Sequence, residues 1–128
     1  MNRKLLLISN STMAGEAYLD WPKKYIKEFL DAEGVKKVTF VPYAGVGLSD
    51  ESLNASYDVY TERVSKVFNE LGFEIESVHN TDDPVKLVVE SEAIAVGGGN
   101  TFHLVSEMQK KGIMDAIKNV SQNGLPYM

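Results

Sequence analysis

Apolar residues along the chain alternate between short continuous runs and longer stretches with helical spacing. The run KLLLIS, at residues 4–9, is typical of a strand buried on both faces of a sheet. Similar runs recur, and the chain ends on LPYM, which begins a further strand. The pattern predicts strands over residues 3–9, 37–43, 73–79, 92–97 and 125–128.

Between these runs, apolar residues recur at steps of three and four, which indicates amphipathic helices. They are expected over residues 20–34, 49–72, 83–91, 100–112 and 113–124. In the first, Asp20 is the expected cap, Pro22 falls in the first turn and Gly34 can close the carboxyl end. The longest carries one apolar face, made of Leu53, Tyr57, Tyr60, Val64, Phe68 and Leu71.

This alternation predicts an α/β fold with a doubly wound, mostly parallel sheet in an α/β/α sandwich. Residues 1–128 are expected to form one domain, since no linker or repeat interrupts them. In this fold class ligands bind beyond the carboxyl ends of the strands. Function is therefore expected in the four loops SNSTMAGEA, PYAGVGLSDES, HNTDDP and GGGNTF.

Composition narrows the classes of function. The net charge of −5 and the pI of about 5.0 argue against a nucleic-acid surface, which would need a basic face. The sequence has no cysteine, which excludes disulfides and thiolate metal sites, and no clustered histidines and carboxylates, so we expect neither a metal nor another cofactor. The apolar run Leu5–Ile8 is too short for a signal core or a membrane span, which favours a cytoplasmic protein without membrane contact.

The stretch AVGGGNTFHL places Gly97, Gly98 and Gly99 between a buried strand and a helix. Glycines let the backbone approach a ligand closely, and a helix that starts directly afterwards turns free N–H groups toward the same point. The loop can therefore bind an anion or a developing oxyanion, with Asn100 capping the helix. Alternatively, the glycines only make a tight turn. Neither a P-loop nor a G-x-G-x-x-G motif is present.

The chain resembles the peptidase E family of serine peptidases, the α-aspartyl dipeptidases, through LLLISNST, VPYAGV, VHNTDDP and AVGGGNTFHL in that order. Cyanophycinases and class I glutamine amidotransferase-like proteins are more distant matches with the same flavodoxin-like architecture. The resemblance implies a Ser–His hydrolase that removes N-terminal aspartate from small peptides through an acyl-enzyme. It assigns oxyanion-hole amides to Gly98 and Gly99. Asn100 and Thr101 are candidates for the pocket wall or the helix cap, and Ser9 and Asn10 either line the pocket or form an ordinary Asx and Ser/Thr turn.

The family's nucleophile elbow, Gly-x-Ser-x-Gly, would begin directly after Met128, and its catalytic histidine would follow later. No serine of this sequence lies in that motif, so no Ser–His pair is nominated. His79 is a possible substrate-side contact, and His103 is expected to be a helix-surface or partly buried residue. Asp82 and Asp83 are interpreted as ordinary helix capping.

Two hypotheses follow. The chain is either the N-terminal portion of a peptidase E, inactive alone and acting on a small peptide substrate, or a truncated, non-catalytic α/β binding or assembly module. An uncovered sheet edge at the last strand, blunted by Pro126 at one position, would favour a homodimer.

Overall fold

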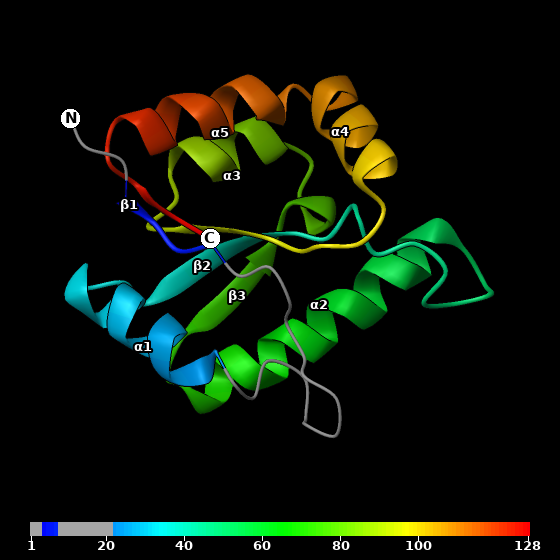
Figure 1. Ribbon diagram of the computed structural model, residues 1–128. Helices are drawn as coiled ribbons and strands as arrows, with labels where there is room; N and C mark the ends of the chain where they lie inside the picture. The colour runs from blue at the N-terminus through cyan, green and yellow to red at the C-terminus, as the bar shows by residue number, and fades with distance from the viewer. Residues whose placement is uncertain (1–3, 8–21) are drawn as a thin grey trace.

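A central sheet lies between two layers of helices in the computed structural model, which describes residues 4–7 and 22–128 (Figure 1). Helices α1 and α2 cover one face, and α3, α4 and α5 lie on the other side (Figure 1). The strands are β1 (Lys4–Leu5), β2 (Lys37–Val41), β3 (Glu74–Ser77), β4 (Ile94–Val96) and β5 (Pro126–Tyr127). The helices are α1 (Lys23–Ala32), α2 (Leu53–Glu70), α3 (Pro84–Val89), α4 (Thr101–Lys110) and α5 (Ile113–Gln122), with a 3₁₀ turn η1 at Val78–Asn80.

The strands follow the order β1-β5-β4-β2-β3, and every pairing between them is parallel. In register, Thr39 of β2 lies opposite Ile94 of β4, and Phe40 of β2 lies opposite Ser77 of β3. The predicted α/β fold with a parallel sheet between helices is confirmed.

Side chains of the central strands alternate between two apolar cores. Val38 and Phe40 pack with Ile26 and Leu30 of α1 in the core on the α1–α2 side. Val41 and Ile94 belong to the second core, which includes Met108, Ile113 and Ile117 of α4 and α5. Both faces of β2 and β4 are therefore buried, which explains the continuous apolar runs in their sequences.

The first strand differs from its prediction. β1 covers only Lys4–Leu5 and lies at the edge of the sheet, while residues 3, 8 and 9 lie outside the described residues. Leu6 packs against the first core, but Leu5 is 46% exposed and Leu7 is 76% exposed. Burial on both faces was the wrong expectation here, because alternate side chains of this edge strand point away from the core.

The last strand is not an edge. β5 pairs with β1 on one side and with β4 on the other, so the expectation that Pro126 blunts an uncovered edge is wrong. The outer strands of the described sheet are β1 and β3. Homodimer formation stays a prediction that the strand order does not test.

The third strand is shorter than predicted, because the chain turns at its carboxyl end. β3 ends at Ser77, and residues Val78–Asn80 form η1. The Ser77 side chain accepts a hydrogen bond from the backbone N–H of His79, which caps this turn. His79 therefore lies on a 3₁₀ turn rather than at the end of a strand.

The helix boundaries agree in part with the sequence. Pro22 occupies the N-cap position of α1 rather than its first turn, and Asp20 lies outside the described residues. On α2, the predicted apolar face is confirmed for Tyr57, Tyr60, Val64 and Phe68. Leu53 is 42% exposed, because it is the first helical residue and extends beyond the core.

Truncating the core at β4 should destabilise the chain. Ile94 is fully buried between the sheet and the helices of the second core, so Ile94→Ala removes apolar contacts and leaves a cavity. We expect the free energy of unfolding, measured in urea, to fall by about 2–5 kcal/mol. Val89→Ala, at a side chain 59% exposed on α3, is the control and should change it by less than about 0.5 kcal/mol. Equal effects of the two substitutions would contradict the placement of β4.

Candidate functional site between the carboxyl ends of β2 and β4

The winding of the chain reverses between β2 and β4. From β2 the chain runs through α2 to β3 on one side, and from β4 it runs through α4 and α5 to β5 on the other side. In open parallel sheets a crevice forms at such a switch point, beyond the carboxyl ends of the two strands. The loops that follow β2 and β4 meet at this point.

Backbone hydrogen bonds hold the two loops together. The Gly97 N–H donates to the carbonyl of Val41 at 3.0 Å, and the Asn100 N–H donates to the carbonyl of Ala44 at 2.9 Å. From α2, the Tyr60 hydroxyl donates to the carbonyl of Gly98 at 3.1 Å. The glycine loop is therefore fixed at both ends and in its middle.

The structural need for glycine differs at each of the three consecutive positions. A Cβ at Gly97 would lie 2.6 Å from the Tyr60 hydroxyl, so only glycine leaves room for that ring. Gly99 has φ +140°, and a Cβ there would collide with the carbonyl oxygen of Ala44. At Gly98 a Cβ would meet no atom within 4 Å, and φ is not positive. Packing therefore explains Gly97 and Gly99 but leaves Gly98 unexplained.

The two middle amides of this loop differ from the amides that flank them. Within the described residues, no hydrogen bond involves the N–H of Gly98 or Gly99, although the flanking N–H groups of Gly97 and Asn100 are both bonded. Gly98 and Gly99 are also exposed. Two fixed, accessible donors next to a helix start can bind an anion or an oxyanion, because the partial positive charge of the helix lies at the same end.

The helix that follows is capped as predicted. The Asn100 side chain accepts a hydrogen bond from the His103 N–H at 3.0 Å, and Thr101 is the exposed first residue of α4. A pocket role for Asn100 and Thr101 stays a prediction. Ser9 and Asn10 lie outside the described residues.

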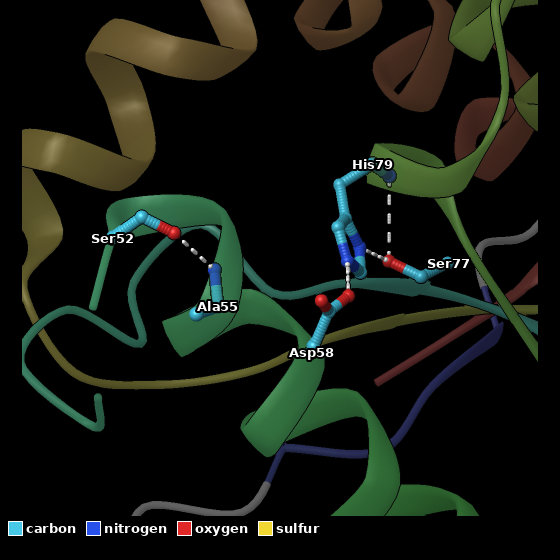
Figure 2. A network of polar contacts seen from close by, with 5 residues as sticks. All are labelled: Ser52, Ala55, Asp58, Ser77 and His79. Atoms are coloured by element: carbon cyan, nitrogen blue, oxygen red, sulfur yellow. Dashed lines mark hydrogen bonds and ion pairs between the residues drawn. The ribbon is translucent and has the colours of Figure 1, made fainter. Parts of the chain in front are cut away.

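Both histidines make side-chain hydrogen bonds to other elements. His103 is partly buried, as expected, and its Nε2 lies 2.6 Å from the hydroxyl of Tyr57 on α2. The His79 ring lies between two groups (Figure 2): its Nε2 is 2.7 Å from the Asp58 carboxylate, and its Nδ1 makes a short hydrogen bond with Ser77 Oγ. Figure 2 also shows Ser52, which caps α2 by accepting from the Ala55 N–H.

The Ser77–His79–Asp58 network brings together residue types that sequence reasoning did not combine. A serine, a histidine and an orienting carboxylate in hydrogen-bond contact are the components of an activated nucleophile. Here, however, Ser77 is only 2% exposed and its oxygen also accepts the backbone N–H of His79. A substrate carbonyl cannot reach the Ser77 hydroxyl, so Ser77 does not act as a nucleophile here. The network instead holds the His79 ring in place at the turn.

His79 also lines a cavity of about 400 Å³ beyond the carboxyl ends of β2 and β3. Two tyrosines line this cavity, Tyr43 and Tyr57. Burial disfavours the charged phenolate and is the main reason why the pKa of each is raised to about 12. The nearby carboxylate of Glu107 raises both further. Both phenols therefore stay protonated near neutral pH. Two loops in which the sequence analysis expects function, PYAGVGLSDES and HNTDDP, supply part of this wall. The contribution of α2 and α4 was not predicted, because their residues follow the helical pattern of a core.

Asp83 caps α3 by accepting from the Lys86 N–H at 3.1 Å, as predicted, whereas Asp82 lines the cavity.

Over residues 4–7 and 22–128 no three histidines or carboxylates lie together in a way that could hold a metal ion. Across the same residues, no helix has the length and apolar character needed to cross a bilayer.

Comparisons of the sequence and of the structure with known proteins point to the same family. The sequence model of peptidase family S51 matches residues 5–128. The chain is 41% identical over 128 residues to a peptidase E of Nostoc sp., and this match covers all of this chain and 50% of that protein. It is 37% identical over 124 residues to a peptidase E of Streptomyces coelicolor, covering 97% of this chain and 46% of that protein.

A solved structure, of a Listeria monocytogenes protein assigned to peptidase E, matches with a TM-score of 0.60 at 25% identity. The match covers 83% of this chain and 52% of that one. The chain thus spans about half the length of the relatives it matches. Since the family match extends over nearly every residue, the resemblance to peptidase E is confirmed and the chain belongs to peptidase family S51.

Proposed function

We propose that this chain supplies the oxyanion-binding part of a serine-type peptidase that hydrolyses small peptides with N-terminal aspartate. The family match and the relatives named peptidase E support peptidase chemistry. The observation that carries the proposal is the pair of amides at Gly98 and Gly99, which bond to no described residue and are held between the bonded amides of Gly97 and Asn100.

Acyl transfer develops negative charge on the carbonyl oxygen of the scissile bond. Donors already fixed around that oxygen stabilise the transition state by a few kcal/mol, because no reorganisation is needed when the charge appears. The Tyr60 hydroxyl donates to the Gly98 carbonyl, and the Asn100 N–H donates to the Ala44 carbonyl. These two hydrogen bonds keep the loop rigid, as an oxyanion-binding role requires. Asn100 and Thr101 would form the adjacent pocket wall.

In this proposal the nucleophilic serine and its base come from the remaining length of the longer relatives. Among the described residues, the serine that lies beside a histidine ring is Ser77, and it is buried. The chain would then form one α/β domain together with that remaining part, and would bind peptide without cleaving it at an enzymatic rate when alone.

The glycine loop generates a paired stability prediction. Gly98→Ala places its Cβ in open space, so the free energy of unfolding should stay within about 0.5 kcal/mol of the parent. Gly99→Ala forces a residue with a side chain into φ +140° and against the Ala44 carbonyl, and it should lose at least about 1–3 kcal/mol. Urea unfolding followed by circular dichroism measures both. A Gly99→Ala chain as stable as Gly98→Ala would show that the loop is not fixed as described.

An activity prediction uses the open position. In a longer peptidase that carries this segment and releases aspartate from Asp-x dipeptides, Gly98→Val should fold normally but lower kcat by about 100-fold or more. The branched side chain would occupy the space through which the substrate oxygen reaches the amides. Gln109→Ala, at an exposed position near the other end of α4, is the control and should retain parental kcat. Parental turnover in a folded Gly98→Val protein would rule out the oxyanion role.

Labelling tests the placement of the nucleophile. A fluorophosphonate probe reacts with activated serines, so the 128-residue chain should keep its intact mass after incubation, because Ser77 is 2% exposed. Mass spectrometry decides the outcome. Stoichiometric modification of Ser77 would instead make Ser77, His79 and Asp58 a working catalytic group in this chain and would overturn the proposal.

A further inference from the structure

The peptide unit between Gly98 and Gly99 can offer a ligand either a donor or an acceptor, depending on its orientation. A peptide unit is planar and trans, so its C=O and its N–H point in opposite directions. When the Gly99 N–H faces outward, the loop presents a donor. A rotation of the unit by about half a turn would present the Gly98 carbonyl instead, and a negatively charged oxygen would then be repelled.

Glycine on both sides makes this peptide unit easy to rotate. Neither Gly98 nor Gly99 has a Cβ that would hinder a rotation of the plane between them. Type I and type II turns differ mainly by such a rotation, which moves φ of the residue after the peptide between negative and positive values. Gly99 has φ +140°, on the side that favours glycine. The observed orientation is therefore one of two that the sequence allows, and a contact must select it.

Tyr60 of α2 supplies such a contact from the core side of the loop. Its hydroxyl donates to the Gly98 carbonyl at 3.1 Å. The side chain belongs to the first core and is 8% exposed, and its ring makes an edge contact with Phe40 of β2, with the ring centroids 5.2 Å apart. The Gly98 carbonyl therefore points toward the core. The Gly99 N–H points away from it, where no described residue accepts its hydrogen bond.

Two glycines make room for the Tyr60 ring. A Cβ at Gly45, in the loop after β2, or at Gly97, in the loop after β4, would overlap this ring. The ring is thus inserted between the two loops that meet at the switch point. Because Tyr60 belongs to α2, its position is set by a third segment and does not depend on the peptide unit that it holds.

We propose that Tyr60 is a positioning residue that keeps the peptide unit between Gly98 and Gly99 in its donor orientation, with the Gly99 N–H directed out of the fold. This inference rests on the proposed oxyanion role of the glycine loop and adds a residue of α2 to it. Tyr60 acts through the peptide unit and not on the substrate, since its hydroxyl is bonded to the carbonyl on the opposite side of that unit from the Gly99 N–H.

The first experiment determines crystal structures of the parent chain and of Tyr60→Phe. The substitution removes the hydroxyl and keeps the ring against Phe40, so the chain should fold. We expect the peptide unit between residues 98 and 99 to be rotated, or to occupy two orientations, in Tyr60→Phe. Tyr57→Phe is the matched control on the same helix. Its hydroxyl contacts His103 and not the glycine loop, so this variant should keep the parental orientation.

The second experiment measures kinetics in a longer peptidase that carries this segment and releases aspartate from Asp-x dipeptides. Tyr60→Phe should lower kcat by about three- to tenfold, as the loss of one neutral hydrogen bond allows. KM should change by less than about twofold, because an oxyanion donor acts mainly in the transition state. Titration with a fluorophosphonate gives the fraction of active enzyme, so that a loss of folded protein does not count as a lower kcat. Tyr25→Phe, at an exposed position on α1, is the activity control and should retain parental kcat and KM.

Two results would each overturn the proposal: an unchanged peptide orientation in Tyr60→Phe, and parental kcat in Tyr60→Phe when Gly98→Val lowers kcat. Failure of the oxyanion role is recognised separately, because Gly98→Val would then also keep parental kcat. The crystal structures decide the orientation of the peptide unit in either case.

Discussion

Two backbone hydrogen bonds between neighbouring loops are the constraint on which the candidate site depends. Gly97 donates to Val41, and Asn100 donates to Ala44, so the loop after β4 cannot move independently of the loop after β2. The chain winds in opposite directions from these two strands, and such a switch point leaves a crevice beyond their carboxyl ends. Gly98 and Gly99 lie in the loop held in this way, and no described residue accepts a hydrogen bond from their amides.

The sequence was sufficient for the fold class and for the position of this loop. Central strands such as β2 and β4 are buried on both faces, and this burial leaves continuous apolar runs that are easy to recognise. Asn100 as a cap also follows from local chemistry, because its side chain bonds a residue only three positions away. Local and periodic signals of this kind do not depend on which distant elements become neighbours.

What the sequence could not supply comes from contacts between distant segments. The strand order places β5 inside the sheet, and no local signal distinguishes an inner strand of two residues from an edge strand. Tyr60 explains two glycines, Gly45 and Gly97, but it lies 15 residues from the first and 37 from the second, and its helical spacing marks it only as a core residue. The loops that carry Tyr43 and His79 were expected to be functional, but the cavity that they form with α2 and α4 was missed for the same reason, since its wall is assembled from four separate segments.

Residue identity and hydrogen bonding alone do not define a catalytic group. Ser77, His79 and Asp58 are connected like the members of a catalytic triad, yet the serine oxygen is buried and already accepts a backbone N–H. Gly98, which has no side chain at all, has the opposite properties: the residue is exposed, its neighbours hold it in place, and its amide bonds to no described residue. Reactivity toward a substrate requires a group that is both held in position and left unsatisfied, because a group already bonded within the fold must lose that bond before it can act.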